Sequence, residues 1–464
     1  MLKKIVKSSS FVLFALVVLV LAACSAAATS TTMPSQRNVV SPPSLELPSP
    51  LISTPDVLNN TGYMVFAWND LGMHCAGPTY DTAVILPPYN TIWAQVVKRG
   101  DPPQVVTEGL TVEYRIINNT YSYGKESFGQ FWDNAFALFG VNLVKDKGLN
   151  LHDPTISNGL SGTMQTEGDH FVADGIPVTP IDDSGGWNPY QIGEITVNDK
   201  SGKVVAHTYL TIPVSDEFSA CGACHEEEGK DTFQVILETH DRLSGTNLVD
   251  QKPVLCASCH GDPGLGVPGP GRYNYLSEAM HGFHSELSPT PMCYNCHPGV
   301  NTDCSRSIAH TTDDGNCTAC HGQLSDVAGS QRTGDRIPWV QEPKCATCHE
   351  DVAQVDTGST LYRNATGHGG LYCASCHGSP HAMVPTDVAS DNYQAMQYQG
   401  AALPIGACES CHFNSKGGAG DFAAVHGGSN PEVANACAVC HTDVSGDTSQ
   451  WPHAFEWASR NTTN

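Results

Sequence analysis

Charged residues are scarce in this chain, and basic residues are the scarcest of them. Of 464 residues only 15% are charged, with 23 Lys and Arg against 47 Asp and Glu, and the formal net charge is −24. Binding to nucleic acid requires clustered Lys and Arg against the phosphates, so nucleic acid is excluded as the main partner. An acidic surface favours cationic partners, but it also serves plain solubility, and both interpretations stay open.

The chain also lacks an apolar run of the roughly 20 residues that a membrane-spanning helix requires. The apolar run 11–23 is shorter and follows three lysines, as in an export signal. Residues 21–24, Leu-Ala-Ala-Cys, resemble the cleavage site of bacterial lipoproteins. The resemblance implies removal of residues 1–23 and a lipid anchor on Cys24, which would hold the protein in the cell envelope, at the outer membrane or cell surface. An ordinary secretory signal with a chance cysteine is the alternative.

Residues 24–57 are rich in Pro, Ser and Thr and have no periodic apolar pattern. Such a composition cannot bury a core, so we expect an extended tether between the anchor and the folded part.

A third absence concerns catalysis. None of the cysteine motifs described below ends in Lys, and a final Lys, as in CxxCK, is the departure that often marks a catalytic site.

The segment 58–215 is predicted to be a β-rich, sandwich-like domain. Strands are indicated where apolar and polar residues alternate or β-formers cluster, at 63–68, 110–116, 194–197 and 204–214. One packed helix is expected before Gly140, which is a fitting stop. Its apolar face, interpreted as core, is formed by Phe128, Phe131, Trp132, Ala135, Phe136 and Phe139.

Cysteine, in contrast, is abundant, and its spacing indicates its use. Nineteen cysteines in an exported chain would first indicate disulfides, but sixteen lie in eight CxxCH motifs. This is the attachment signature of c-type haem, in which two thiols bond to the porphyrin and the histidine binds iron. One motif alone could belong to a zinc or redox site, whereas eight predict eight haem c groups. The attachment cysteines are Cys221, Cys224, Cys256, Cys259, Cys293, Cys296, Cys317, Cys320, Cys345, Cys348, Cys373, Cys376, Cys408, Cys411, Cys437 and Cys440.

The motifs begin 35, 37, 24, 28, 28, 35 and 29 residues apart. About 30 residues per motif cannot build an ordinary apolar core, so the porphyrins would supply much of it. We therefore expect a multidomain protein in which residues 216–464 form a mostly irregular, sparsely helical multihaem domain. The stretch 261–272, rich in Gly and Pro, is predicted to be a loop. The histidines that end the motifs, called the motif histidines below, are His225, His260, His297, His321, His349, His377, His412 and His441.

Eight further histidines follow the first motif, as many as there are motifs. We predict that they supply the second axial ligands, so that each iron has two histidines. With no iron open to a substrate, this arrangement favours electron transfer over catalysis. Methionine is the rival ligand, at Met280, Met292, Met383 or Met396, where core filling is the alternative role. These histidines, called the distal candidates below, are His240, His281, His284, His310, His368, His381, His426 and His453.

Two pairs of nearby histidines indicate contact with more than one iron. His281 and His284 are three residues apart, so on a helix they would be neighbours that bind different irons. His381 follows the motif histidine His377 by four residues, too few to reach the far side of the same iron. We predict that His381 binds a neighbouring iron, and that His368 binds another one or, alternatively, the iron of His377.

Several short sequence segments, called phrases below, resemble segments of surface multihaem cytochromes of metal-respiring bacteria. The resemblance covers most of residues 60–460, with the CxxCH motifs as its specific part. It implies extracellular electron transfer to redox partner proteins or to acceptors such as metal oxides. The phrases are WNDLGMHC (68–75), GLSGTM (159–164), GIPVTPIDD (175–183), IPVSDEFSACGACH (212–225), CSRSIAH (304–310), CHGSPHAM (376–383) and WPHAFEW (451–457).

Cys75 and Cys304 lie outside the motifs. In an oxidising envelope a disulfide between them would join the two domains, although two buried or free thiols fit as well. His74 is open to three roles, as a haem ligand, part of a metal site or a structural residue. The isolated histidines His152, His170 and His207 are interpreted as ordinary surface or core residues.

Three functions agree with the sequence features described above. The first is an electron-transfer cytochrome without enzymatic activity. The second is an octahaem reductase of a small nitrogen or sulfur compound, which needs an open iron site that the motifs do not indicate. The third is a non-redox role of the β-rich domain in adhesion, in docking, or in assembly into a homo-oligomer or filament, for which no residue identifies a ligand.

Overall fold

The structure is a computed structural model that describes residues 62–77, 79–100, 102–217, 219–298, 301–311, 317–349, 360–407 and 410–412. All of them belong to one unit, Leu45–Asn464. The predicted signal and tether lie outside the described residues, as do Cys24, Cys408, Cys437, Cys440, His426, His441 and His453. No helix within the described ranges is long and apolar enough to cross a membrane.

Two five-stranded sheets dominate the N-terminal half. In the first, the order is β1-β4-β9-β8 with β5 on β4, and β1 runs antiparallel to β4 from Tyr63 opposite Lys98 to Asn69 opposite Ile92. In the second, the order is β2-β11-β10-β6-β7. The strands are β1 (Tyr63–Asn69), β2 (His74–Cys75), β4 (Ile92–Lys98), β5 (Gln104–Val105), β6 (Leu110–Ile117), β7 (Ser161–Thr163), β8 (Gln165–Glu167), β9 (His170–Ala173), β10 (Tyr190–Asp199) and β11 (Val204–Ser215). The predicted β-rich region is therefore confirmed.

Side-chain alternation explains how the second sheet meets the core. In β6, Val112, Tyr114 and Ile116 are buried while the residues between them are exposed, as the sequence predicted. They share one hydrophobic cluster with residues of the first sheet, including Val65 and Ile92. Both sheets thus bury one face in the same core.

β11 departs from simple alternation because both of its faces are covered. Leu210 and Ile212 belong to the main core, whereas Tyr209 on the opposite face packs against Tyr393. Tyr393 begins α12 (Tyr393–Gln399), which lies over the sheet. The strand was predicted correctly, but the covering helix comes from a distant part of the chain.

The predicted helix is α3 (Gly129–Phe139), and Gly140 ends it in the left-handed conformation with φ 71°. Phe131, Trp132 and Ala135 are buried as expected. Phe136 was wrongly assigned to the apolar face, because its side chain is 64% exposed. The buried stripe continues instead to Leu138, which lies three residues after Ala135 on the same helical face.

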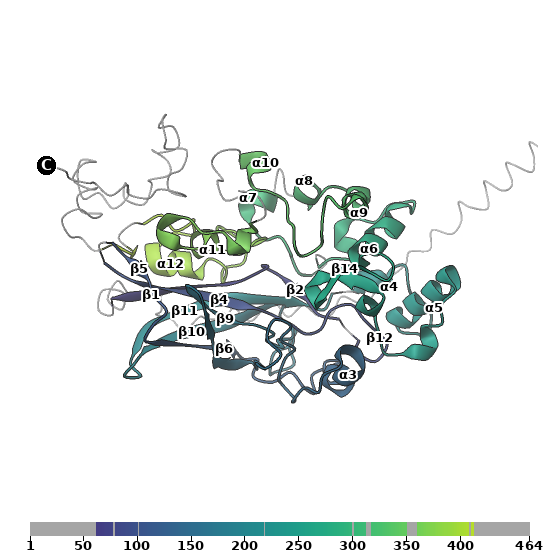
Figure 1. Ribbon diagram of the computed structural model, residues 1–464, viewed down its shortest axis with the longest axis horizontal. Coiled ribbons are helices and arrows are strands. Elements are labelled where there is room, and N and C mark those ends of the chain that lie inside the picture. Colours follow the sequence, from purple (N-terminus) through teal and green to yellow (C-terminus); the bar gives the residue numbers. More distant parts are fainter. Residues whose placement is uncertain are drawn as a thin grey trace, which may run out of the picture. The chain divides into compact units, whose positions relative to one another are not determined.

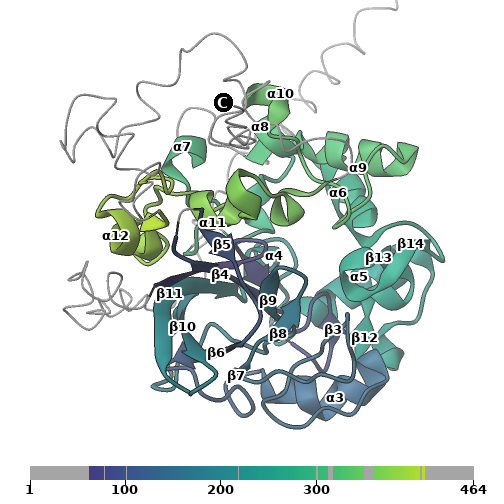
Figure 2. The same ribbon diagram turned by 60° about the vertical axis from the view of Figure 1, so that its left-hand side comes forward.

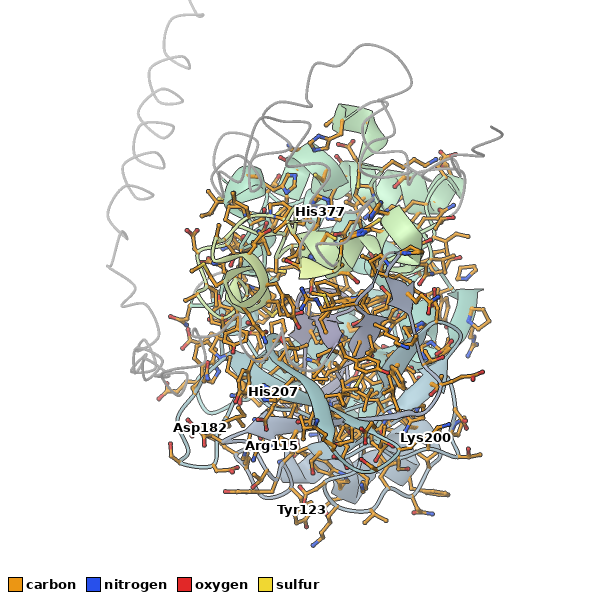
Figure 3. The ribbon with its side chains drawn as sticks, turned by 90° about the vertical axis from the view of Figure 1, so that its left-hand side faces the viewer. Arg115, Tyr123, Asp182, Lys200, His207 and His377 are labelled. Atoms are coloured by element: carbon orange, nitrogen blue, oxygen red, sulfur yellow. The ribbon has the colours of Figure 1, made fainter. Side chains whose placement is uncertain are left out.

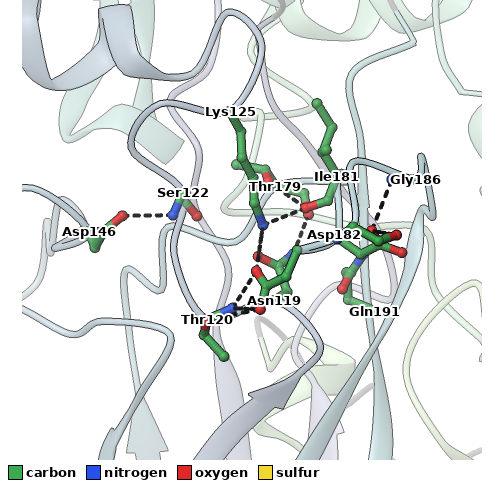
Figure 4. Close-up of polar contacts among 12 residues, drawn as sticks. Asn119, Thr120, Ser122, Lys125, Asp146, Thr179, Ile181, Asp182, Gly186 and Gln191 are labelled. Carbon is green, nitrogen blue, oxygen red and sulfur yellow. Dashed lines mark hydrogen bonds and ion pairs between the residues drawn. The ribbon is translucent and has the colours of Figure 1, made fainter.

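A buried lysine connects the loops around the second sheet (Figure 4). The Nζ atom of Lys125 donates hydrogen bonds to Asn119 Oδ1 and to the carbonyl oxygen of Ile181, each over 2.7 Å, and lies 3.3 Å from Asp183 Oδ1. Burial lowers the pKa of Lys125. The ammonium group fills this oxygen-lined space, so the network serves the structure of the β-rich region.

The outer face of the first sheet packs against the motif-bearing half of the chain. Met64, Phe66 and Trp68 of β1 share a cluster with Tyr372 and Tyr398. The views of Figures 1 and 2 both place the green helices α11 and α12 against this side of the strands. The sheets therefore form a platform on which later segments are fixed.

Buried Gln95 of β4 adds polar contacts to this platform. Its Nε2 atom donates to the carbonyl oxygen of Gly370 over 3.0 Å, and its Oε1 atom accepts from the N–H of Tyr372 over 3.1 Å. Ser375 Oγ donates to the same Oε1 over 3.2 Å. These three contacts hold the segment that contains the motif at Cys373 against the sheet.

After β11 the elements are short, in agreement with the sparsely helical region predicted from the sequence. Short helices and turns carry or flank the motifs, and β12 pairs with β3 of the N-terminal half. The elements are β3 (Ala83–Val84), α4 (Ser219–Gly222), α5 (Thr232–Ser244), η1 (Val249–Gln251), β12 (Val254–Leu255), η2 (Cys256–Ser258), β13 (His260–Asp262), η3 (Pro263–Leu265), β14 (Val267–Gly271), α6 (Leu276–Ser285), η4 (Cys293–Asn295), α7 (Ile308–Thr311), α8 (Cys317–His321), α9 (Leu324–Thr333), α10 (Ala346–His349), η6 (Tyr362–Asn364), η7 (His368–Gly370) and α11 (Cys373–His377).

The stretch 261–272 is not the irregular loop that its composition predicted. β13 and β14 pair antiparallel across it. A Cβ atom on Gly261 would lie 1.7 Å from the carbonyl oxygen of Gly269, so the two backbones approach too closely for any side chain. Glycine here permits a tight ribbon rather than preventing regular structure.

Candidate cofactor site

Each described CxxCH motif begins with a tight, helix-like turn. The N–H groups of His225, His297 and His349 donate to the carbonyl oxygens of the first cysteine of their own motifs over 2.8, 2.9 and 2.9 Å. Residues three apart share a face of such a turn, so the two thiols of a motif point to the same side. This local conformation suits covalent attachment of one group at two neighbouring positions.

Six motif histidines lie opposite a distal candidate. In each pair the two ring centres are separated by 5.9 to 6.4 Å, although the partners are far apart in the sequence. The planes range from nearly parallel, 19° for His281 and His297, to nearly perpendicular, 86° for His310 and His349. The pairs are His225–His284, His260–His240, His297–His281, His321–His381, His349–His310 and His412–His368.

These separations fit one metal ion between two imidazoles. A metal–nitrogen bond of about 2 Å on each side, plus about 1 Å from each nitrogen to its ring centre, places the centres about 6 Å apart. No group of three or more Cys, His, Asp and Glu side chains converges as a metal site among the described residues. Two imidazoles are the axial donors of a bis-histidine haem iron, and two nearby thiols are the groups through which a haem c porphyrin is attached.

The second ring nitrogen of several paired histidines is held by an acceptor. On α6, Nδ1 of His281 donates to the carbonyl oxygen of Ser277, and Nδ1 of His284 to that of Met280, each over 2.7 Å. In the same way, Nδ1 of His240, His260 and His381 faces an oxygen atom of Thr246, Asn274 and Leu71. A proton on Nδ1 leaves the lone pair on Nε2, which is the nitrogen available to iron.

Burial favours the neutral form of five of the paired imidazoles by lowering their pKa values. It lowers the pKa of His297 to about 4, and burial together with the nearby Arg336 guanidinium lowers the pKa of His321 to about 4. Burial also lowers the pKa of His225, His281 and His381. A neutral imidazole is the form that binds a metal, so no proton must be displaced near neutral pH.

Contacts between motifs show which sites are neighbours. The thiol of Cys296 raises the pKa of the nearby Cys221 thiol, and burial together with the nearby Cys293 thiol raises the pKa of Cys317. α6 provides both His281 and His284, whose rings lie opposite His297 and His225. The motifs that begin at residues 221, 293 and 317 therefore lie side by side.

The histidine-rich stretch 367–383 belongs to several sites rather than to one. His377, labelled in Figure 3, ends α11, away from the labelled sheet residues Arg115 and His207. The flanking His368 and His381 lie opposite His412 and His321, not opposite His377. One short segment thus contributes rings to at least two other motifs.

Most histidines of the N-terminal half make ordinary polar contacts. Nε2 of buried His74 lies 2.9 Å from Asp70 Oδ1, without a third metal-binding side chain. His152 pairs with Asp174 over 2.6 Å and His207 with Glu194 over 2.8 Å. His170 stacks on Trp93 with ring centres 4.3 Å apart, next to Tyr372.

Cys75 and Cys304 are half-buried neighbours and are both thiols in this structure. Burial, reinforced by negative charge at Cys304, raises the pKa of Cys75 well above its ordinary value. Burial also raises the pKa of Cys304 to about 11. The predicted disulfide between them remains a prediction.

Arg306 has a positioning role that the sequence did not reveal. It lies in CSRSIAH, donates from Nη1 to the carbonyl oxygen of Gly72 over 2.7 Å, and donates from its backbone N–H to that of His381 over 2.6 Å. Three of the segments that carry the resemblance therefore meet at one buried residue, Arg306. The signal available beforehand was only an arginine in a segment with few charges.

Comparisons with known proteins add little. No family model matches the chain, and no curated protein matches it. The crystal structure of MtrC from Shewanella baltica OS185 aligns with 10% sequence identity and a TM-score of 0.13, over 62% of this chain and 43% of that chain. A TM-score this low does not establish a common fold, so nothing about function follows from it.

Proposed function

We propose that the chain is an electron-transfer multihaem cytochrome c with eight covalently bound haem groups, most of them held by two histidines. The observation that carries the proposal is the set of six imidazole pairs, each joining a CxxCH histidine to a distal candidate at 5.9 to 6.4 Å. An accidental arrangement would not match the motif histidines one to one with histidines from elsewhere in the chain.

Cysteines, histidines and hydrogen-bond acceptors would have separate roles in holding each haem group. The paired cysteines of each motif would fix the porphyrin covalently, and the two histidines would bind the iron through Nε2. The acceptors at Nδ1, such as the carbonyl oxygens of Ser277 and Met280, would set the orientation of the rings. Bound haem supplies a one-electron ferric/ferrous couple, while the protein sets its spacing and exposure.

The pairing also bears on the reductase alternative. A reductase must leave one axial position open to its substrate, but six motif histidines already face a second imidazole. This observation supports electron transfer without enzymatic activity.

The proposed setting is extracellular or outer-surface electron transport. It rests on the lipoprotein-like cysteine Cys24 and on the resemblance to surface cytochromes. Electrons would pass between redox partner proteins and acceptors such as metal oxides. The negative charge of the chain would favour cationic partners or surfaces.

Carbon monoxide binding and electron paramagnetic resonance test the proposal on the mature protein. We expect low-spin signals and no rapid carbon monoxide binding in the native protein. His240→Ala should open one iron, giving one high-spin signal and about one equivalent of bound carbon monoxide. His152→Ala, at a histidine that is neither a motif histidine nor a distal candidate, is the matched control and should change neither. Rapid stoichiometric binding to the native protein would instead favour the reductase.

A further inference from the structure

Among the paired sites, the one formed by His321 and His381 has a distinctive charge environment. His321 ends α8, and α9 follows after Gly322. α9 ends at Gly334, which has φ 83°, and the backbone N–H of Arg336 then returns to the carbonyl oxygen of Ser330 over 3.0 Å. This turn brings the side chain of Arg336 back to the motif histidine.

The guanidinium group of Arg336 contacts His321 at two points. Its Nη2 atom lies 2.9 Å from Nδ1 of His321, and its Nη1 atom lies 3.4 Å from the carbonyl oxygen of the same residue. Arginine carries only donors, so it cannot accept a proton from Nδ1. Where His281 and His284 donate Nδ1–H to a carbonyl oxygen, His321 faces a cation instead.

The positive charge of Arg336 is not neutralised by a carboxylate. Within the described part of the chain no acidic side chain forms an ion pair with it, and burial lowers the pKa of Arg336. Nearby Arg332, on α9, is different, because it is mostly exposed and lies 3.3 Å from Glu278. Arg336 therefore acts on His321 with little screening by a counter-charge.

We propose that Arg336 gives the iron site of His321 and His381 a more positive reduction potential than it would otherwise have, so that electrons reside there preferentially. The inference rests on the proposed function. A nearby cation disfavours the ferric state, which has one more positive charge than the ferrous state.

If both sites held haem, one electron would pass from the reduced neighbouring site to the oxidised site held by His321 and His381, and no proton would move. The thiol of Cys293 lies close enough to Cys317 to affect its ionisation, so the two motifs are neighbours. A more positive potential at the second site makes this step favourable and its reversal slower.

Redox titration of Arg336→Met tests the inference. The substitution removes the charge and keeps much of the volume. It should lower most the midpoint potential of the haem at His321, and less that of the neighbouring haem at His281, whose imidazole also lies in the field of Arg336. We expect at least a tenfold change in the ferrous-to-ferric ratio of the haem at His321 at a fixed potential, which corresponds to a shift of about 59 mV for one electron. Arg336→Lys should retain most of the native potential. Arg332→Met is the matched control and should shift no potential by this amount.

A background variant assigns the shift to the correct site. In His381→Met, a thioether-bound ferric haem would have its own far-red absorption, so its midpoint can be followed alone. If that absorption fails to appear with full haem content, the proposed ligation is wrong. If it appears but Arg336→Met leaves its potential unchanged or raises it, the ligation stands and the role of Arg336 is refuted.

Discussion

The guanidinium of Arg306 and the carboxylate of Asp391 form a buried ion pair in which Nε lies 2.7 Å from Oδ2 and Nη2 lies 3.2 Å from Oδ1. Their side chains are only 1% and 6% exposed. The same guanidinium also donates to the carbonyl oxygen of Gly72, on the loop after β1. One charged group thus holds together a loop of the first sheet and two segments of the motif-bearing half.

Asp391→Asn should destabilise the protein strongly, because it leaves the buried guanidinium without a counter-charge. Removing one partner of a buried pair typically costs about 3–5 kcal/mol. Chemical denaturation followed by tryptophan fluorescence and haem absorption measures the loss. Glu278→Gln, at the ion pair with the solvent-exposed Arg332, should change the free energy of unfolding by less than about 1 kcal/mol. Equal losses in both variants would contradict the structural role of Arg306.

Gly72→Ala should disturb the iron site of His381. A Cβ atom at Gly72 would lie 1.7 Å from the carbonyl oxygen of Pro380, and the backbone has φ +78°. The clash must displace the segment that carries His381, whose Nδ1 faces the carbonyl oxygen of Leu71 over 3.3 Å. We expect one high-spin haem signal and new carbon monoxide binding.

The control for this change is Gly124→Ala. Gly124 has φ +91°, but no atom lies within 4 Å of the added Cβ. Both variants should lose about 1–3 kcal/mol from backbone strain, and only Gly72→Ala should alter the haem signals. Unaltered signals in Gly72→Ala would show that the loop does not position His381.

Cys75 and Cys304 should form a disulfide in the mature exported protein. Non-reducing peptide mapping should recover them as one cross-linked peptide, and Cys75→Ser with Cys304→Ser should lower the free energy of unfolding by about 2–4 kcal/mol under oxidising conditions. Recovery of two free thiols would disprove the bond. In that case both should resist alkylation in the folded protein, because burial raises their pKa values.

The ion pair of His152 and Asp174 should make stability depend on pH. A hydrogen bond from His152 to Asp174 raises the pKa of His152 above 6.5, so its contribution is full below that value and is lost as the pH rises. Burial opposes ionisation of Asp174, but hydrogen bonds from His152 and Thr91 hold its pKa below 3.8, so its contribution is lost as the pH falls.

The stabilisation is therefore greatest between about pH 4 and 6.5. His152→Ala should lose about 0.5 kcal/mol at pH 5 and less at pH 8, because the pair is partly exposed and screened. Denaturant titrations at the two pH values measure the difference. The same loss at both would show that packing rather than charge explains the effect.

The elements with local signals were predicted well. Alternation in β6 placed Val112 and Ile116 in the core, and Gly140 ends α3 as expected. The failures have tertiary causes. β11 is covered on its second face by Tyr393 from a distant helix, and the ribbon of β13 and β14 uses glycine to bring two backbones together.

For the candidate site, the sequence supplied the residue types but not their partners. Spacing alone indicated that His281 and His284 serve different irons. It could not indicate that their rings lie opposite His297 and His225, because that depends on how α6 packs against two separate motifs. No sequence motif indicated the contact between Arg336 and His321, because that contact depends on the turn after α9.

The doubly covered first sheet has a consequence for biogenesis. Met64, Phe66 and Trp68 are translated before Tyr372 and Tyr398, which later cover them. If the chain is exported and binds haem as proposed, the strand exposes an apolar surface until the later motifs have received their haem groups. Completion of the later motifs would thus act as the step that closes this surface, and chains that stall in haem attachment should be the ones that aggregate or are degraded.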